Sequence, residues 1–270
     1  MSTHPDCVLC SLEAGEALRH TTPRNEIWIM LEHDAIYGAA ALPESELPAE
    51  VKGFFQQHIK SLPLARFQLI KQGRADSAAN PSLFVALTRP GQPHRLYRFQ
   101  APLAELLTLD IAAIVAGDPR YAAALTDEQM VLVCTNGKKD IACATYGMPL
   151  LKALKDIKGA SVWQSSHIGG HRFAGTLAHL PSGAYYGRIR PEEAATWWAI
   201  VQTGVVDDAH YRGNCSLDNP SQAAEIHLRA ALGVKTWDGL GFVSQTPDGD
   251  GAWIITFTRN GHAHTVRVTR

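Results

Sequence analysis

Residues 130–143 read Met-Val-Leu-Val-Cys-Thr-Asn-Gly-Lys-Lys-Asp-Ile-Ala-Cys, an apolar run that leads into a polar loop with a cysteine at each end. The apolar residues predict a buried strand that runs into Cys134. Because the loop contains Asn136 and Gly137, the chain can turn and bring Cys143 back toward the first thiol. Backbone N–H groups and the two lysines of such a loop favour the thiolate form. We therefore expect two thiols with lowered pKa values at the end of this strand.

A second motif, His167-Ile-Gly-Gly-His171, follows an expected strand at residues 161–163. Glycine has no side chain, so the pair lets the backbone approach a bulky inorganic group. Each glycine would cost a helix about 1 kcal/mol relative to alanine, so we expect a loop or a helix start here. Thiolates and imidazoles together leave zinc and iron–sulfur clusters as the main candidates. The predicted metal ligands, with both pairs at strand ends, are Cys134, Cys143, His167 and His171.

Apolar periodicity places further strands and helices on both sides of these motifs. Toward the N-terminus we expect strands over 27–31, 67–69, 83–87 and 95–99, a helix over 48–59 and a helical pattern over 103–115. Toward the C-terminus we expect a helix over 148–156, a hairpin of 173–180 with 185–189, helices from Pro191 and over 218–232, and a hairpin of 253–257 with 264–268. The alternation of strands and helices predicts an α/β protein. The two halves share a rough strand-helix-strand-strand order, although their residues do not repeat.

The segment Gly117-Asp-Pro-Arg120 is the predicted seam between two domains, because glycine, aspartate and proline punctuate local structure. Alanine-rich and acidic residues follow it before the next strand. We accordingly expect an N-terminal segment over 1–24, a smaller α/β domain over 25–120 and a second domain over 121–270.

The composition is that of a folded, soluble protein. With 270 residues, 46% of them hydrophobic, the chain can bury a sizeable core. Its formal net charge of −1 gives no overall positive potential that would attract nucleic acid or an anionic membrane. No segment approaches the roughly 20 apolar residues of a membrane helix, and the first residues lack the layout of a secretory signal. Five cysteines form a low and odd count that fits a reducing compartment. We predict a cytoplasmic protein without nucleic-acid or membrane partners.

Several strings together resemble the sucrase/ferredoxin-like family, a branch of the thioredoxin-like 2Fe-2S ferredoxins. They are residues 133–140, 163–174, Leu180-Pro-Ser-Gly with Tyr186-Gly-Arg188, Tyr211-Arg-Gly, Gln222-Ala-Ala-Glu225, and Thr22-Pro-Arg with residues 28–32. The resemblance implies a C-terminal thioredoxin-like ferredoxin domain. The smaller α/β domain before it could be a degenerate thioredoxin-like duplicate. It also implies a 2Fe-2S cluster held by Cys134, Cys143, His167 and His171, in which the two histidines replace a second cysteine pair.

The implied function is that of a one-electron carrier rather than a catalyst. Two neutral imidazoles in place of two thiolates raise the potential of such a cluster, as in Rieske centres. An exposed second ring nitrogen could couple an electron to a proton, with a potential that falls by up to about 59 mV per pH unit. Redox partner proteins are expected; Lys138, Lys139 and Arg172 either dock an acidic partner or are ordinary solvated charges. The sequence offers no positioned carboxylate pair for a glycosidase.

Two alternatives stay open at this point. The same Cys2His2 set could hold zinc in a structural or interaction module, although paired zinc cysteines usually lie closer together than these two. A thiol oxidoreductase could use Cys7-Val-Leu-Cys10, although this motif precedes the first expected strand instead of following one. Cys215 has no predicted role.

Overall fold

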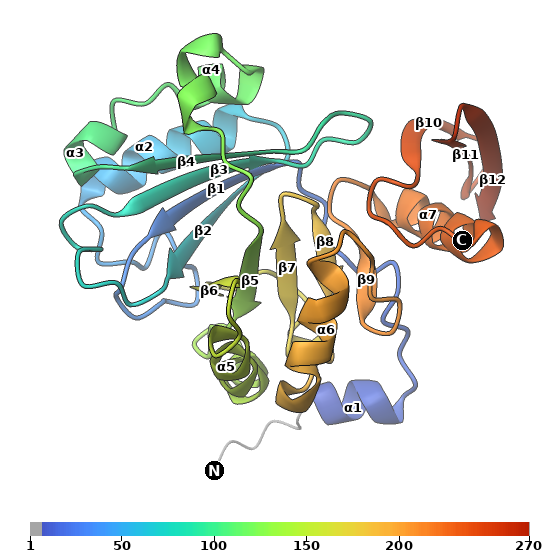
Figure 1. Cartoon of the computed structure of the whole chain (residues 1–270), viewed down its shortest axis with the longest axis horizontal. Helices are drawn as coiled ribbons and strands as arrows, with labels where there is room; N and C mark the ends of the chain where they lie inside the picture. Colours follow the sequence, from blue (N-terminus) through green and yellow to red (C-terminus); the bar gives the residue numbers. More distant parts are fainter. Residues whose placement is uncertain (1–6, 270) are drawn as a thin grey trace.

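A computed structural model describes residues 7–269, which form a nine-stranded mixed sheet beside a three-stranded antiparallel sheet (Figure 1). The large sheet has the strand order β4-β3-β1-β2-β6-β5-β7-β8-β9, and the small sheet has the order β10-β11-β12. The strands are β1 Ile27–Glu32, β2 Ala65–Lys71, β3 Ser82–Leu87, β4 Arg95–Gln100, β5 Met130–Cys134, β6 Ser161–Ser165, β7 Leu177–Leu180, β8 Ala184–Tyr186, β9 Tyr211–Asn214, β10 Gly241–Pro247, β11 Ala252–Arg259 and β12 His262–Thr269. The helices are α1 Cys7–Glu13, α2 Ala49–Ser61, α3 Leu103–Leu106, α4 Ile111–Ala116, α5 Ile141–Lys155, α6 Ala194–Val201 and α7 Asn219–Leu232, with short 3-10 helices η1 Pro119–Ala124, η2 His171–Phe173 and η3 Pro191–Glu193. The predicted α/β class is confirmed.

The large sheet contains the same arrangement twice. In the first half, β1 and β2 are parallel neighbours joined by α2, β3 lies antiparallel on the other side of β1, and β4 follows outside β3. In the second half, β5 and β6 are parallel neighbours joined by α5, β7 lies antiparallel on the other side of β5, and β8 follows outside β7. The halves meet where β2 pairs antiparallel with β6, through Ile70 opposite Ser165 and Lys71 opposite Gln164.

Both faces of β1, β3 and β5 are buried, which explains why these strands are nearly continuous apolar runs. In β1, Ile27 faces a core that α2 and α4 cover, whereas the next residue, Trp28, faces a second core. That second core is shared, because it takes side chains from both halves, including Ile70 of β2 and Met130 of β5. A third core packs α5 and α6 against β5 in the second half (Figure 1). The predicted ligand cysteines lie at the edge of the shared core.

The C-terminal part follows the sequence signals closely, with one addition. Helix α7 begins after Asp218, whose Oδ1 accepts a hydrogen bond from the Ser221 backbone N–H at 3.0 Å, and ends at Gly233 in the left-handed conformation. The predicted hairpin is β11 with β12, turning at Asn260 and Gly261, which both have positive φ. The small sheet also contains β10, which the sequence pattern did not predict.

Some predicted elements differ from the structure. The helical pattern over 103–115 forms two short helices. Helix α3 ends at Leu106, and α4 begins after Asp110, which caps it by accepting from the Ala113 N–H at 3.0 Å. The predicted strand over 173–180 is only β7, because η2 occupies its first residue. Across residues 7–269, the helices all lack the combination of length and hydrophobicity that crossing a membrane would require.

Candidate metal centre

The two predicted ligand cysteines lie on different elements. Cys134 is the last residue of β5, whereas Cys143 lies in the first turn of α5 and both are buried. The prediction that both ligand pairs lie at strand ends is therefore wrong for Cys143. Helix α5 begins seven residues before the predicted residue 148, because the Asp140 side chain accepts from the Ala142 N–H at 2.9 Å and caps it.

A glycine in α5 brings this helix close to the first cysteine. A Cβ atom built on Gly147 would lie 2.0 Å from the carbonyl oxygen of Cys134, which no side chain could tolerate. Gly147 therefore lets the helix lie directly against the end of β5. The result is that the two thiols face the same point.

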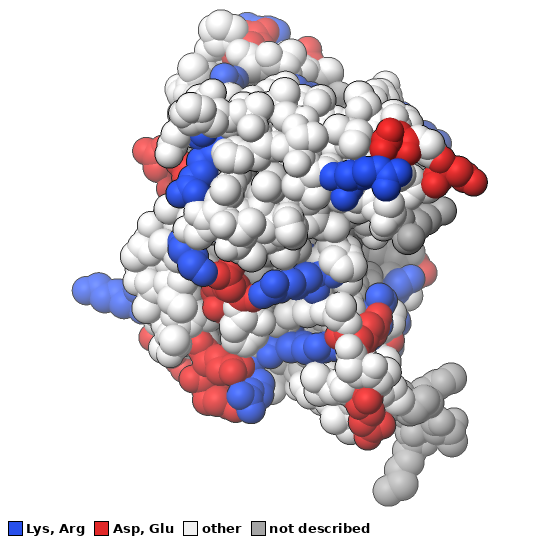
Figure 2. Space-filling model, turned by 90° about the vertical axis from the view of Figure 1, so that its right-hand side faces the viewer, with Lys and Arg blue, Asp and Glu red and all other residues white. Residues whose placement is uncertain are grey.

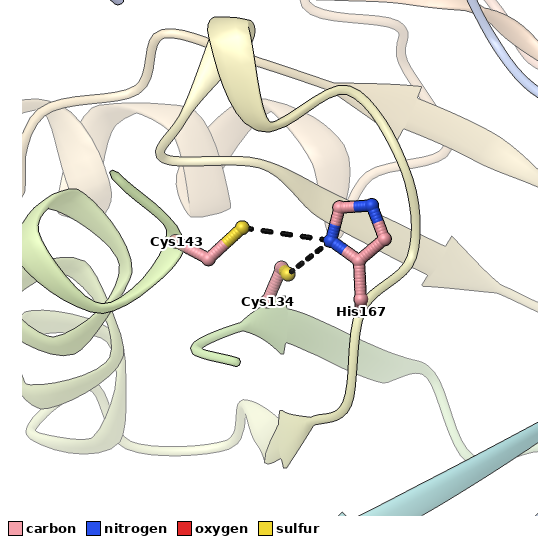
Figure 3. Close-up of side chains that lie close together, drawn as sticks. All are labelled: Cys134, Cys143 and His167. Atoms are coloured by element: carbon pink, nitrogen blue, oxygen red, sulfur yellow. Dashed lines mark hydrogen bonds between the residues drawn. The ribbon is translucent and has the colours of Figure 1, made fainter. Parts of the chain in front are cut away.

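His167 completes a group of three donors (Figure 3). It follows β6 in the loop of residues 166–171, here called the histidine loop. Its Nδ1 atom lies 3.7 Å from Sγ of Cys134 and 3.6 Å from Sγ of Cys143. Two sulfurs and one imidazole nitrogen thus converge in a largely buried position, and such a donor set suits zinc or an iron–sulfur centre.

His171, the fourth predicted ligand, lies beside this group rather than inside it. Its ring centroid is 5.9 Å from that of His167, and its Nε2 atom lies 3.7 Å from Oδ2 of Asp140. The Cys7 thiol contacts the other oxygen of the same carboxylate at 3.8 Å. Cys7, Asp140 and His171 therefore form a second group of possible metal donors. As predicted, His171 stands at a helix start, that of η2.

The position of Cys7 at the site was missed by sequence reasoning. The motif Cys7-Val-Leu-Cys10 indicated a dithiol or a separate metal site, and Cys7 lies 133 positions before Asp140 in the sequence. Local sequence carries no signal for such a contact. Helix α1 packs against η2, while Cys10 is exposed and Cys215 is buried beside the Thr88 hydroxyl at 3.6 Å.

Donors from four strand positions hold successive carbonyl groups of the histidine loop. The His167 carbonyl accepts from Nη2 of Arg66 at 2.7 Å and from Nε2 of Gln68 at 3.4 Å. The Ile168 carbonyl accepts from the hydroxyl of Tyr185 at 3.3 Å. The Gly169 carbonyl accepts from Nη1 of Arg212 at 3.1 Å. The loop is therefore fixed by both halves of the sheet, since Arg66 and Gln68 belong to β2 and the other donors to β8 and β9.

The glycine pair of the loop is required by the protein itself. Gly169 and Gly170 have φ values of +103° and +78°, which side-chain-bearing residues rarely adopt. A Cβ atom on Gly170 would lie 2.4 Å from Nη2 of Arg212, and one on Gly169 would lie 3.1 Å from Pro23. The close approach that the sequence suggested is thus made, at Gly170, by a guanidinium group.

The two thiols differ in how readily they ionise. The Cys143 thiol donates to the Cys134 sulfur and holds the pKa of Cys134 well below its ordinary value, and the His167 imidazole acts in the same direction. The pKa of Cys143 is raised, because the same hydrogen bond favours its thiol form and burial disfavours a second charge. Cys134 therefore ionises more readily than Cys143, and the sequence-based expectation of a lowered pKa is wrong for Cys143. Metal binding would release the proton that this thiol holds.

A family model described as sucrase/ferredoxin-like matches residues 16–213, more than half of the chain. The chain belongs to the sucrase/ferredoxin-like family. The matched region of this sucrase/ferredoxin-like protein contains Cys134, Cys143, His167 and His171, and it ends within β9. Helix α7 and the small sheet lie beyond it.

Curated relatives of this sucrase/ferredoxin-like chain include two yeast proteins named altered inheritance of mitochondria protein 32. The protein of Meyerozyma guilliermondii is 31% identical over 103 residues, which cover 33% of this chain and 35% of the relative. That of Debaryomyces hansenii is 34% identical over 98 residues, which cover 32% of this chain and 33% of the relative. The chain thus spans about a third of the length of the curated relatives it matches. No solved structure gives a significant match.

Proposed function

We propose that the protein is a one-electron carrier whose 2Fe-2S cluster is held by Cys134, Cys143, His167 and His171. The observation that carries the proposal is the convergence of two buried sulfurs on Nδ1 of His167, with the His171 ring next to it. Thiolate and imidazole are the ligands that Rieske-type clusters use. Membership of a family described as sucrase/ferredoxin-like adds support.

The arrangement of the strands supports a thioredoxin-like interpretation of both halves. Each half has a parallel strand-helix-strand unit followed by two antiparallel strands. We therefore propose that the second half is a thioredoxin-like ferredoxin unit and that the first half is a degenerate duplicate without ligands. This interpretation gives the first half a supporting role at the histidine loop.

The residues around the site would exclude water on one side and leave access on the other. Cys134 and Cys143 are buried, whereas the side chain of His171 is 41% exposed. When bound, the cluster would supply a one-electron couple whose potential the neutral imidazoles raise. His171 can hold a proton on Nε2, facing the carboxylate of Asp140, so proton-coupled transfer remains part of the proposal.

The surface next to the site is suited to an acidic redox partner protein. Lys138 and Lys139 are exposed in the loop between the ligand cysteines, and the apolar side chain of Ile141 is 64% exposed beside them. Arg172 is a weaker candidate for docking, because it pairs with Glu16 at 2.5 Å. On the face shown in Figure 2, cationic and anionic side chains alternate across the described residues, which offers no basic stripe there for nucleic acid.

A zinc-binding structural or interaction module is the second candidate, and one observation favours it. In tetrahedral zinc sites the sulfur and nitrogen ligands lie about 3.6 Å apart, given the usual Zn–S and Zn–N bond lengths. The two sulfur-to-nitrogen distances here are 3.7 and 3.6 Å. Both sulfur-to-nitrogen distances therefore match those of a single bound zinc ion, and metal analysis decides between the candidates.

The test is anaerobic purification of the full chain, followed by visible absorption, EPR after reduction, and assay of iron, sulfide and zinc. We expect a red-brown protein with equal iron and sulfide and an EPR signal from the reduced state. Cys134→Ser should lose colour and iron, while Cys10→Ser, a matched change at an exposed cysteine, should retain both. A colourless protein that contains zinc without iron would overturn the cluster and support the zinc module.

We also propose the cytoplasm, or another reducing compartment, as the location of the protein. None of the five cysteines forms a disulfide in the structure, which agrees with such a compartment. The yeast relatives carry a name that refers to inheritance of mitochondria. Fractionation of cells that express a tagged chain would test the proposal, and recovery from mitochondria would contradict a cytoplasmic location.

A further inference from the structure

Arg212 lies directly beneath the histidine loop and is almost completely buried, with 1% of its surface exposed. Its Nη1 atom donates to the Gly169 carbonyl at 3.1 Å, and its Nη2 and Nε atoms donate to the backbone and side-chain oxygens of Thr21 at 2.7 and 3.1 Å. The guanidinium also stacks on the rings of Phe173 and Tyr185, at 5.1 and 5.6 Å from their centroids. Every one of these hydrogen-bond acceptors is an uncharged oxygen.

A second buried arginine in the same fold shows the contrast. Arg229 of α7 is also buried, and its guanidinium pairs with the carboxylate of Glu225 one turn earlier. An isolated charge costs much free energy to bury, so buried cations are normally paired with an anion. Burial lowers the pKa of Arg212 to about 10, which still leaves the group protonated at neutral pH. Arg212 is therefore a fixed positive charge, and none of the groups that it hydrogen-bonds to is an anion.

Arg212 holds the loop that carries His167 and His171, through the carbonyl of Gly169 between them. Gly170 lets the guanidinium lie against the loop backbone, and the Cys134 sulfur, after the Tyr185 hydroxyl, is among the groups whose charge would raise the pKa of Arg212. Arg66 reaches the same loop from the other side, at the His167 carbonyl. Two cationic groups thus bracket the ligand loop, and one of them is fully enclosed.

We propose that Arg212 is a positioning residue that raises the reduction potential of the centre by stabilising its reduced, more negative form. The inference rests on the proposed electron-carrier function. Reduction takes one electron from a one-electron donor, makes and breaks no bond, and adds one negative charge beside the guanidinium. In the low dielectric of the interior, a fixed positive charge favours that form over the oxidised one.

The experiment is a potentiometric titration of the anaerobically purified, cofactor-loaded full chain, followed by EPR. Arg212→Gln should lower the equilibrium constant for reduction at least tenfold, which corresponds to a potential about 59 mV lower. Arg212→Lys keeps the charge but not the planar fork, so its potential should stay closer to that of the wild type. Arg120→Gln is the matched control, because Arg120 also lies over an aromatic ring, that of Tyr121, but it is exposed, paired with Asp118 and located in η1 of the first half. Its potential should be unchanged.

A second variant neutralises the guanidinium without removing it. Thr21→Asp would place a carboxylate at the position of the hydroxyl that now accepts from Nε of Arg212. Its potential should fall in the same direction as that of Arg212→Gln, and it decides the question if Arg212→Gln does not fold. A wild type without a one-electron centre would overturn the proposed function itself. If the wild type has such a centre, and both variants have the same reduction potential as the wild type, only the role of Arg212 would be overturned.

Discussion

His171 and Asp140 lie side by side, with Nε2 of the imidazole 3.7 Å from Oδ2 of the carboxylate. A metal-bound histidine commonly directs its second ring nitrogen toward a carboxylate, which fixes the ring orientation and the tautomer. The same carboxylate caps α5, the helix that carries Cys143. One aspartate thus connects the orientation of one predicted ligand to the position of another.

Asp140→Asn should raise the reduction potential. Asparagine caps helices about as well as aspartate, so α5 should keep its start, while the negative charge beside His171 is lost. We expect the equilibrium constant for reduction to rise by up to tenfold, or about 59 mV, in a potentiometric titration. Asp156→Asn, at the exposed far end of the same helix, is the control and should leave the potential unchanged. A lower potential for Asp140→Asn would contradict this account.

Single substitutions can establish whether His171 or Cys7 is the fourth ligand, since both contact Asp140. If His171 is the ligand, His171→Ala should lose most of the iron and the visible absorption, whereas Cys7→Ser should retain both. Iron assay and absorption of the two anaerobically purified variants provide the measurement. The reverse pattern would assign the fourth position to Cys7 and remove the bis-histidine interpretation.

Gly170→Ala should destabilise the histidine loop. Alanine in a left-handed conformation costs about 1–2 kcal/mol, and its Cβ would also displace the guanidinium of Arg212. We expect a lower free energy of unfolding in urea and weaker retention of the metal. Gly53→Ala, in α2 where an added Cβ meets nothing within 4 Å, should instead be neutral or stabilising by up to about 1 kcal/mol. Equal effects of both variants would contradict the role given to Gly170.

His210 should make the stability of the metal-free protein depend on pH. Its pKa is raised, first because Nδ1 bonds to Oδ2 of Asp207 at 2.6 Å and also because Glu193 is close. A raised pKa in the folded state means that the stabilisation is complete below the ordinary value near 6.5 and is lost as pH rises through the folded value. Relative to wild type, His210→Gln should lose about 1–2 kcal/mol at about pH 5.5 and little at about pH 9 in urea unfolding. A constant difference across this range would be inconsistent with the predicted linkage.

The elements that could be predicted from the sequence are those with strong local signals. Asp218 and Gly233 marked the two ends of α7, and the apolar residues of β1 and β5 marked two central strands. Strand β10 gave no such signal, because its side chains are mostly half-buried or exposed. Its position is determined by pairing with β11, which is a tertiary interaction.

The same division applies to the candidate site. Cys134, Cys143 and His167 could be predicted because they are chemically distinctive residues in short motifs, and the structure brings them together. The supporting residues Arg66 and Arg212 could not be predicted, since each contacts the histidine loop from a strand far away in the sequence. Arginines on strands are common, and only the folded chain reveals which of them lie under a loop.

The pairing of β2 with β6 has a consequence for dissecting the molecule. Arg66 and Gln68 stand on β2, so the half without predicted ligands contributes two of the four donors that hold the loop carbonyls of the other half. Severing the chain between the halves would leave the fragment with the predicted ligands without these two donors and with one uncovered edge of its sheet. The first half therefore supports the histidine loop, and truncation to the second half alone would remove that support.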